Sequence, residues 1–404
     1  MKYAYEYVPF YNSRFKEAGI TPSEIKTATD LTKLPILSKD EVKNNIDQIV
    51  STKYDLSKLK SYSTSGSTGK PLQGYITRKE YDHRRSKHLR ANISIGQRPR
   101  DKWVTLVSPR HRAVSRLQRL LGFFVPTPVS VFNDVGTQIS LIAELKPDIL
   151  DGYSNSLLLL AKEVEKRGIA SIKPRSIIGG AESIEYSSRQ FIERVFDAPF
   201  YDQYACVEMA RIAWQCKEKN DYHIDADSII VQFIDGDGEE VSSGERGQIV
   251  CTSLFNYALP FIRYAVGDIG IPSDEECPCG RTLPLMKAVE GREDSFIFLS
   301  DGRVLSPMVL NAVLEAFKFH NKIDQYRIIQ RNIDLTEFVI KMSSDCVDEG
   351  TVEKELLEHL RRTLNISADT TTFEVKFVEK FPLDKSGKVR KVVSELNLNS
   401  LGKH

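Results

Sequence analysis

The stretch Ser63-Thr64-Ser65-Gly66-Ser67-Thr68-Gly69-Lys70-Pro71 decides how the rest of the chain is interpreted. Eight of its nine residues are glycines, short hydroxyl residues or lysine, so the backbone can bend sharply and present N–H groups, hydroxyls and one ammonium to a polyanion. A solvated Ser/Gly linker is the alternative, but the strand-like Gly74-Tyr75-Ile76-Thr77 follows at once. We therefore interpret this stretch as a phosphate-binding loop.

The spacing within the loop excludes the nucleotide-binding loop of strand–loop–helix NTPases. That loop needs four residues between its glycines and a Ser or Thr directly after the lysine. Here two residues separate Gly66 from Gly69, and Pro71, which has no hydroxyl, follows Lys70. With Tyr62 before it, the loop instead resembles the signature loop of the adenylate-forming superfamily of acyl-CoA synthetases and related ligases. The resemblance implies that the ATP phosphates are bound by Ser65, Gly66, Ser67, Thr68, Gly69 and Lys70, the last also serving as a catalytic cation.

Length and composition bound the class of protein. A chain of 404 residues can bury a large core and predicts two domains of unequal size. A net charge of +1 implies no polyelectrolyte partner, so we expect neither nucleic acid nor a membrane to be bound. The sequence contains no signal peptide and no bilayer-spanning segment, which predicts a cytoplasmic location. Six cysteines in so long a chain predict thiols or metal ligands instead of a disulfide framework.

The order of predicted elements indicates the fold class. From Lys146 onward, strand-like and helix-like segments alternate: a strand at 147–150, a helix at 157–166, a strand at 175–178 and a helix at 187–195. This alternation predicts a large, layered α/β domain with a largely parallel sheet. A hairpin, a helix, a strand pair and a further amphipathic helix then predict a small α+β unit. The resemblance places the boundary between an N-terminal domain, residues 1–292, and a mobile C-terminal lid domain, residues 293–404.

Three downstream motifs resemble nucleotide-binding motifs of the superfamily. Gly180, Ala181 and Glu182 end a predicted strand and resemble its adenine-binding turn, in which glycines let the backbone lie flat against a purine. Arg263-Tyr264-x-x-Gly267-Asp268 resembles a motif whose aspartate accepts hydrogen bonds from both ribose hydroxyls, and a carboxylate suits a diol because it has acceptors only. Gly291-Arg292-x-Asp294 resembles the hinge motif, which implies that Arg292 lies near the ribose and the phosphate.

A fourth motif supplies the expected magnesium ligand. The segment Tyr204-Ala205-Cys206-Val207-Glu208 resembles the Tyr-Gly-x-Thr-Glu pattern of the superfamily at its two ends. The resemblance implies that Tyr204 contacts the nucleotide and that Glu208 helps to hold Mg²⁺ on ATP, a role that suits a hard oxygen ligand. Ala205 and Val207 replace the usual Gly and Thr, and Ser67 and Thr68 are available for the phosphate contact that the missing hydroxyl would make.

The last motif lies near the C-terminus. Leu383-Asp384-Lys385-Ser386-Gly387-Lys388 follows a predicted strand and resembles the C-terminal loop of the superfamily, whose lysine enters the active site during adenylation. The resemblance implies that Lys388 bridges the carboxylate and the α-phosphate as charge develops on the latter.

Four residues form a candidate zinc site. Cys216 and His223, with Cys277 and Cys279, offer three thiolates and one imidazole, which is a ligand set that structural zinc accepts. Pro278 and Gly280 allow the tight turn that such chelation needs. Four unrelated side chains remain the alternative, because Cys-x-Cys is less usual than Cys-x₂-Cys.

Two basic stretches, residues 78–90 and 110–119, have two interpretations. Their Arg, Lys and His side chains either form solvated helix faces or receive CoA phosphates or an anionic substrate. The sequence does not choose between them.

Taken in order, the motifs cover almost the whole chain and resemble the phenylacetate–CoA ligase family, including its capsule-biosynthesis-type members. The resemblance implies ATP-dependent activation of a carboxylic acid as an acyl-adenylate, followed by transfer to the thiol of CoA. The expected cofactors and co-substrates are ATP, Mg²⁺, CoA and a structural Zn²⁺. An amine acceptor or a nucleotide transferase in polysaccharide or cofactor synthesis, and a non-catalytic nucleotide-binding protein, stay open as alternatives, as does assembly into a homodimer.

Overall fold

The computed structural model describes residues 1–63, 72–108, 114, 116–182, 184–218, 221–292, 295–305, 307–343, 348–367, 371–381 and 391–396. The predicted phosphate-binding residues Ser65 to Lys70 and the predicted catalytic Lys388 therefore lie outside the described residues. The chain divides into two compact units that part between Val289 and Glu290. None of the helices in the described ranges combines the length and the hydropathy that a bilayer-spanning helix needs.

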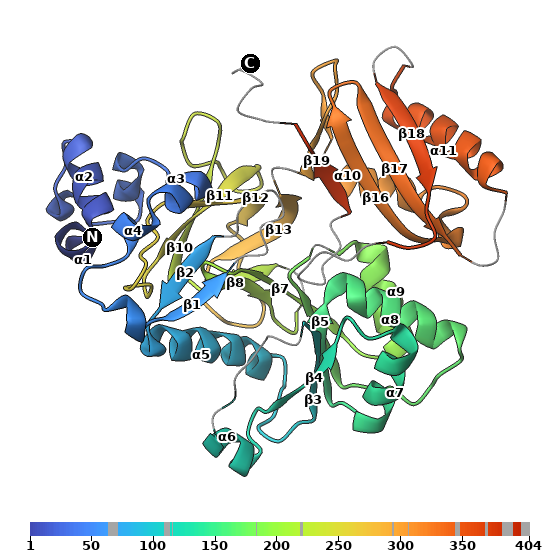
Figure 1. The fold of residues 1–404 in the computed structure, drawn as a ribbon, viewed down its shortest axis with the longest axis horizontal. Helices are drawn as coiled ribbons and strands as arrows, with labels where there is room; N and C mark the ends of the chain where they lie inside the picture. Colours follow the sequence, from blue (N-terminus) through green and yellow to red (C-terminus); the bar gives the residue numbers. More distant parts are fainter. Residues whose placement is uncertain are drawn as a thin grey trace. The chain divides into compact units, whose positions relative to one another are not determined.

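One large sheet organises the first unit, in the strand order β10-β11-β12-β13-β9-β8-β7-β6-β5-β3-β4. Its parallel half contains β3 (Trp103–Val107), β4 (Pro126–Ser130), β5 (Ile149–Tyr153), β6 (Ser176–Gly180) and β7 (Phe200–Cys206). The helices α7 (Val135–Leu145), α8 (Ser154–Lys166) and α9 (Tyr186–Phe196) alternate with these strands and share an apolar core with them (Figure 1). The predicted α/β alternation is confirmed, because buried runs such as Ile149-Leu150 suit strands covered by helices. The short helix α6 (Arg116–Leu121) precedes β4.

The other half of the sheet is antiparallel where pairs are described. It consists of β8 (Ala210–Gln215), β9 (Tyr222–Ile224), β10 (Ile229–Ile234), β11 (Gly247–Ser253), β12 (Tyr264–Ser273) and β13 (Leu285–Arg292). Residues 235–246 connect β10 to β11, which pair in an antiparallel register.

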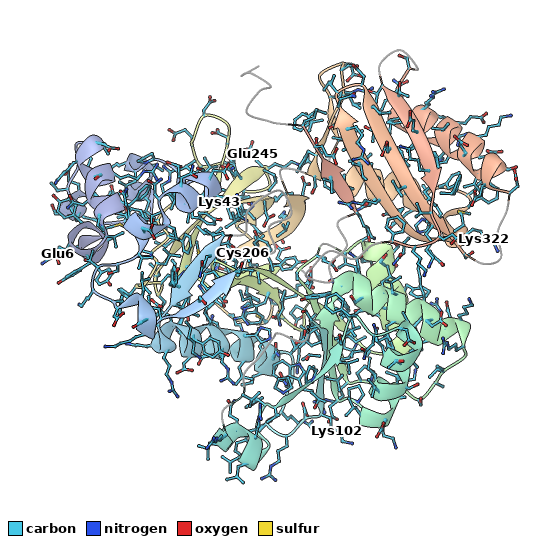
Figure 2. The ribbon with its side chains drawn as sticks, viewed as in Figure 1. Glu6, Lys43, Lys102, Cys206, Glu245 and Lys322 are labelled. Atoms are coloured by element: carbon cyan, nitrogen blue, oxygen red, sulfur yellow. The ribbon has the colours of Figure 1, made fainter. Side chains whose placement is uncertain are left out.

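The N-terminal helices pack on this antiparallel half through a second apolar core, which includes Tyr11, Phe15, Phe261 and Tyr264. They are α1 (Lys2–Tyr7), α2 (Pro9–Glu17), α3 (Lys39–Asn44) and α4 (Ile46–Ile49), with 3₁₀ turns at Pro22–Glu24, Thr29–Lys33 and Leu56–Lys58. Figure 2 marks Lys43 on α3 and Cys206 at the end of β7, two reference points for the site described below.

A hairpin and a long polar helix follow the N-terminal segment. The hairpin strands are β1 (Lys60–Ser63) and β2 (Gln73–Ile76), and the helix is α5 (Arg78–Ser94). A capping box starts α5, because the Thr77 hydroxyl accepts from the N–H of Glu80 at 3.1 Å and the Glu80 carboxylate accepts from the N–H of Thr77 at 2.5 Å.

The second unit has the predicted α+β composition. Its four-stranded sheet has the order β18-β17-β16-β19, with β16 and β17 antiparallel. The elements are β14 (Ile297–Phe298), β15 (Val304–Leu305), α10 (Pro307–Glu315), a 3₁₀ turn at His320–Lys322, β16 (Ile323–Asn332), β17 (Leu335–Met342), α11 (Glu349–Leu364), β18 (Thr372–Phe377) and β19 (Val392–Ser394). Val352, Leu356, Leu360 and Leu364 on one face of α11 are buried in the core of this unit, as the helical spacing predicts.

Candidate active site and metal centre

The hairpin of β1 and β2 brings the two ends of the signature loop together. Ser63 pairs with Gln73 in an antiparallel register, so the chain leaves and re-enters the hairpin at adjacent positions. The ring of Tyr62 lies against Gly74, where a Cβ atom would overlap it, and the Arg84 guanidinium lies 5.0 Å from the centroid of this ring. A cleft of about 480 Å³ is lined by Ser61, Tyr62, Ser63 and Gln73. The hairpin therefore places Ser63 and Gln73 on adjacent strands beside an open cleft.

The predicted adenine-binding turn follows β6. A Cβ atom at Gly180 would lie 2.8 Å from the carbonyl oxygen of Gln203, so glycine is required by the close approach of β6 and β7. Ala181 has a φ of 65°, which is uncommon for a residue with a side chain. The Glu182 carboxylate accepts from the N–H of Asn155 at 3.1 Å, in the first turn of α8. Glu182 thus caps a helix, and its contact with a nucleotide stays a prediction.

Tyr204 and Asp268, predicted from separate motifs, are hydrogen-bonded to each other. The Tyr204 hydroxyl, near the end of β7, donates to Oδ2 of Asp268 on β12 at 2.6 Å. Burial, with the nearby Asp268 carboxylate, raises the pKa of Tyr204 well above its usual value, so the phenol stays protonated and donates. The bond orients the carboxylate that is predicted to receive the ribose hydroxyls.

The Glu208 carboxylate, from the same motif as Tyr204, contacts two other side chains. Its side chain is 6% exposed, and its Oε1 atom accepts from the Tyr264 hydroxyl at 3.0 Å. The Lys39 ammonium lies 3.6 Å from this same oxygen. Tyr264 and Asp268 both belong to the Arg-Tyr-x-x-Gly-Asp motif. Two hydrogen bonds therefore join this motif to the motif that runs from Tyr204 to Glu208. We call Tyr204, Glu208, Tyr264 and Asp268 the phenol–carboxylate cluster.

Lys39 belongs to none of the sequence motifs and was not predicted as a site residue. Lys39 is the first residue of α3, and the Ser38 side chain caps this helix by accepting from the N–H of Glu41. The contact between Lys39 and Glu208 joins residues that are 169 positions apart in the chain. It could therefore not be predicted from the sequence around Lys39.

The helix α5 exposes Lys79, Asp82 and Ser86 to solvent, but several of its basic residues have partners inside the protein. Arg84 donates to the carbonyl oxygens of Val207 at 2.9 Å and Glu208 at 2.6 Å, and so holds the backbone that carries the predicted magnesium ligand. Lys87 is 6% exposed, and burial lowers its pKa to about 8. Its ammonium lies 3.8 Å from Oδ2 of Asp225.

Asp225 is the centre of this buried polar contact. Its side chain is fully buried and accepts two hydrogen bonds of 2.9 Å from Arg211 and one of 3.1 Å from the indole N–H of Trp214. Arg90 on α5 also pairs with it. These contacts give the basic residues Arg84, Lys87 and Arg90 internal partners, which the sequence interpretation as a CoA site did not foresee.

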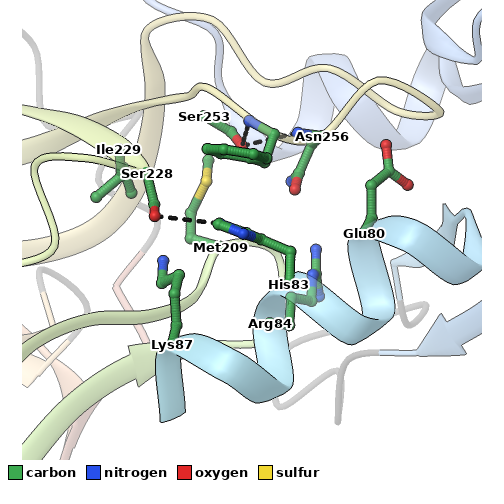
Figure 3. Close-up of a pocket in the computed structure, with 10 residues that line it drawn as sticks. Glu80, His83, Arg84, Lys87, Met209, Ser228, Ile229, Ser253 and Asn256 are labelled. Carbon is green, nitrogen blue, oxygen red and sulfur yellow. Dashed lines mark hydrogen bonds between the residues drawn. The ribbon is translucent and has the colours of Figure 1, made fainter. Parts of the chain in front are cut away.

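A small cavity lies between α5 and the loop after β11 (Figure 3). His83 stacks on Phe255 with ring centroids 3.6 Å apart, and its Nε2 atom lies 3.1 Å from the Ser228 hydroxyl. Burial lowers the pKa of His83. The cavity volume is about 10 Å³, the space of a single water molecule, which is too small for an organic substrate.

The four predicted zinc ligands converge. The candidate ligand atoms of Cys216, His223, Cys277 and Cys279 all lie within 4.8 Å of one another. The sulfurs of Cys216 and Cys277 are 3.6 Å apart, and the Cys279 sulfur is 3.3 Å from His223 Nε2. Tetrahedral zinc, with bonds of about 2.3 Å to sulfur and 2.0 Å to nitrogen, sets its ligand atoms about 3.5–3.8 Å apart. These four residues, which we call the thiol–imidazole cluster, therefore fit a closed zinc site.

The chain is similar to known proteins both in sequence and in fold. No family model matches the chain. A phenylacetate–coenzyme A ligase from Pseudomonas putida is 26% identical over 91% of this chain and 86% of its own length. A Staphylococcus aureus protein named CapK is 23% identical over 96% of this chain and 85% of its own length. A 2-hydroxyisobutyryl-CoA ligase crystallised with an adenylate in its postadenylation state superposes with a TM-score of 0.79, at 20% identity, over 98% of this chain and 87% of that one. The last likeness shows the fold of the chain.

Proposed function

We propose that this chain, which is phenylacetate–CoA ligase-like in sequence and has the fold of adenylate-forming ligases, activates a carboxylic acid with ATP and transfers the acyl group to CoA. In the first half-reaction a carboxylate oxygen attacks the α-phosphorus of ATP, which gives acyl-AMP and pyrophosphate. In the second, the thiol of CoA attacks the acyl carbon, which gives the thioester, AMP and a proton. The adenylate is needed because a free carboxylate has no good leaving group.

The meeting of the two motifs in the phenol–carboxylate cluster carries this proposal. Tyr204 and Asp268 are bonded at 2.6 Å, and Glu208 and Tyr264 at 3.0 Å, although about 60 residues separate the partners in each pair. A carboxylate that accepts only, held by a protonated phenol, suits a ribose diol.

Glu208 fits the proposed magnesium ligand by its chemistry. It offers hard carboxylate oxygens from a mostly buried position, and its backbone is held by Arg84 and by Asn256, whose side chain donates to the Glu208 carbonyl at 3.1 Å. Bound Mg²⁺ would neutralise charge on the departing pyrophosphate. Lys70, in the signature loop, would add a cation there. Lys388 would stabilise the charge that develops at the α-phosphate from a mobile lid formed by residues 293–404.

We favour CoA over an amine as the acceptor, because two of the three similar proteins named above are CoA ligases. A cytoplasmic location suits this assignment, since ATP and CoA are available there and the three thiols of the thiol–imidazole cluster would stay reduced.

The thiol–imidazole cluster is proposed to bind one structural Zn²⁺. Three thiolates and one imidazole complete a tetrahedron and leave no position for water or substrate. The ion would tie the segment after β8 to the loop that precedes β13, and so stabilise the fold without taking part in the reaction.

An exchange experiment tests the proposed function. Radioactive pyrophosphate is incubated with the protein, ATP, Mg²⁺ and one member of a panel of aryl, alkyl, hydroxy and amino acids. We expect label to appear in ATP only with acids that fit, and the product to become a thioester when CoA is added. Asp268→Ala is the negative control. Exchange with none of the acids, or label in ATP without any acid, would contradict adenylation of a carboxylate.

A further inference from the structure

The N-terminal segment before α3 is paired with the strand that carries the ribose-binding motif. The N–H of Leu37 donates to the carbonyl oxygen of Arg263 at 2.7 Å, and the N–H of Ala265 donates to that of Leu37 at 3.0 Å. The two bonds form a parallel bridge between Leu37 and Tyr264. The register of residues 37–39 is therefore fixed against the start of β12.

The side chain of Arg263 reinforces this pairing. Its side chain is buried, and its Nη1 atom donates to the carbonyl oxygens of Leu34 at 2.6 Å and Thr32 at 3.1 Å. Its φ of 49° is uncommon for a residue with a side chain, which indicates that surrounding contacts impose the conformation. The first residue of the Arg-Tyr-x-x-Gly-Asp motif thus serves as a clamp on residues 32–34.

The next side chain along this clamped segment is placed at Glu208. Ser38 caps α3, and Lys39 begins it, with an ammonium 3.6 Å from Oε1 of Glu208. This is the oxygen that also accepts from Tyr264. The Lys39 side chain is 32% exposed and the Glu208 side chain 6%, so the lysine can swing into water while the carboxylate cannot.

We propose that Lys39 pairs with Glu208 and neutralises its charge while the metal is absent, and that Mg²⁺ displaces Lys39 from this carboxylate when Mg·ATP binds. The proposal rests on the function proposed above. A buried carboxylate without a cation is unfavourable, and Lys39 removes that cost in the ligand-free protein. A divalent ion on the same carboxylate repels the ammonium, so Lys39 moves away and the N-terminal segment senses occupancy of the site.

The first arm of the test is a double-mutant cycle on the ligand-free protein. Lys39→Met should lower the melting temperature by roughly 2–6 °C, because it leaves Glu208 uncompensated. In the Glu208→Gln background the same change should have little effect, and Lys39→Arg should behave like the parent. Lys43→Met is the matched control, since Lys43 lies one turn later on α3 and pairs with Asp40 at 3.0 Å. An equal loss with and without Glu208, or no loss beyond that of Lys43→Met, would overturn the pairing.

The second arm measures exchange with the metal. Mg·ATP should raise the melting temperature of Lys39→Met by more than that of the parent, and calorimetry should show binding about 3- to 10-fold tighter, because the repulsion is gone. Equal shifts in both proteins would overturn the exchange and leave the proposed function standing. No shift in either protein would overturn the exchange and the proposed nucleotide site together.

Discussion

The phenol–carboxylate and thiol–imidazole clusters lie in the same unit, but they are built in different ways. The first joins β7 to β12 through hydrogen bonds between oxygen atoms, and one of its carboxylates, Glu208, also pairs with Lys39 from the N-terminal segment. The second gathers sulfur and nitrogen atoms, all within 4.8 Å of one another, from the segments around β9 and before β13. The difference suits the proposals made above, in which the oxygen site exchanges its ligands and the sulfur site keeps one ion.

If only the phenol–carboxylate cluster takes part in the reaction, the largest loss of activity should follow substitution of Lys388. This lysine is proposed to act at that cluster from the second unit. Lys388→Ala should reduce formation of the acyl-adenylate by ~10²–10³-fold, because it removes a charge that acts only as the α-phosphate reacts. Thioester formation from supplied acyl-adenylate should change by less than about threefold. Rapid-quench assays of each half-reaction measure both rates. Comparable losses in the two half-reactions, or an unaffected adenylation rate, would remove Lys388 from this role.

The next largest effect should come from the ribose partner. Asp268→Ala should weaken ATP binding by ~2–4 kcal/mol, or about 30- to 700-fold, since two hydrogen bonds to a charged group are lost. Affinity for the carboxylic acid should change much less. Calorimetric titration with ATP and with the acid separates these quantities, and an unchanged ATP affinity would contradict the assignment.

A smaller effect is expected when the hydrogen bond that orients Asp268 is removed while the Asp268 carboxylate itself is kept. Tyr204→Phe removes the hydroxyl that donates to Asp268 at 2.6 Å but keeps the carboxylate and the ring. We expect ATP affinity to fall by only about 3- to 10-fold, the equivalent of ~1 kcal/mol. A loss as large as that of Asp268→Ala would mean that Tyr204 is itself an indispensable nucleotide ligand. The same calorimetric titration decides between the two.

The smallest effect on turnover should follow disruption of the thiol–imidazole cluster. Cys279→Ser should lower the melting temperature by more than about 5 °C and abolish stoichiometric zinc, while kcat at a temperature where the variant stays folded changes by less than about threefold. Cys251→Ala is the control, because this buried thiol lies outside the cluster and its loss should leave one zinc ion per chain. Elemental analysis that finds no zinc in carefully prepared parent protein would refute the metal assignment.

The local motifs were predictable because each depends on residues close together in the chain. The Cys and His residues at 216, 223, 277 and 279 were predicted to lie together from their side-chain types, and the alternation of strands and helices after Lys146 predicted the parallel half of the sheet. The hydrogen bond between Tyr204 and Asp268 could not be predicted from local sequence. It depends on where β7 and β12 lie in the sheet, which follows from packing across the whole first unit.

Charged residues were the least predictable part. The composition of α5 suggests exposure, yet Glu80 and Lys87 are buried, and Glu80 accepts from the N–H of Ala258 at 2.8 Å. A buried charge is stable only if its partners are in place, and those partners, such as Asp225, lie more than a hundred residues away. For the same reason Lys39 could not be assigned to Glu208, nor Glu182 to the N-terminus of α8, before the fold was known.

The most direct test of the account follows an oxygen atom. An accepted carboxylic acid labelled with ¹⁸O in both carboxylate oxygens is converted with ATP, Mg²⁺ and CoA, and the nucleotide product is analysed by mass spectrometry. The account predicts AMP that carries one ¹⁸O atom, since the oxygen that attacked the α-phosphorus stays on phosphorus when the thiol displaces it from the acyl carbon. Unlabelled AMP, or ADP with ¹⁸O in inorganic phosphate, would contradict activation through an acyl-adenylate.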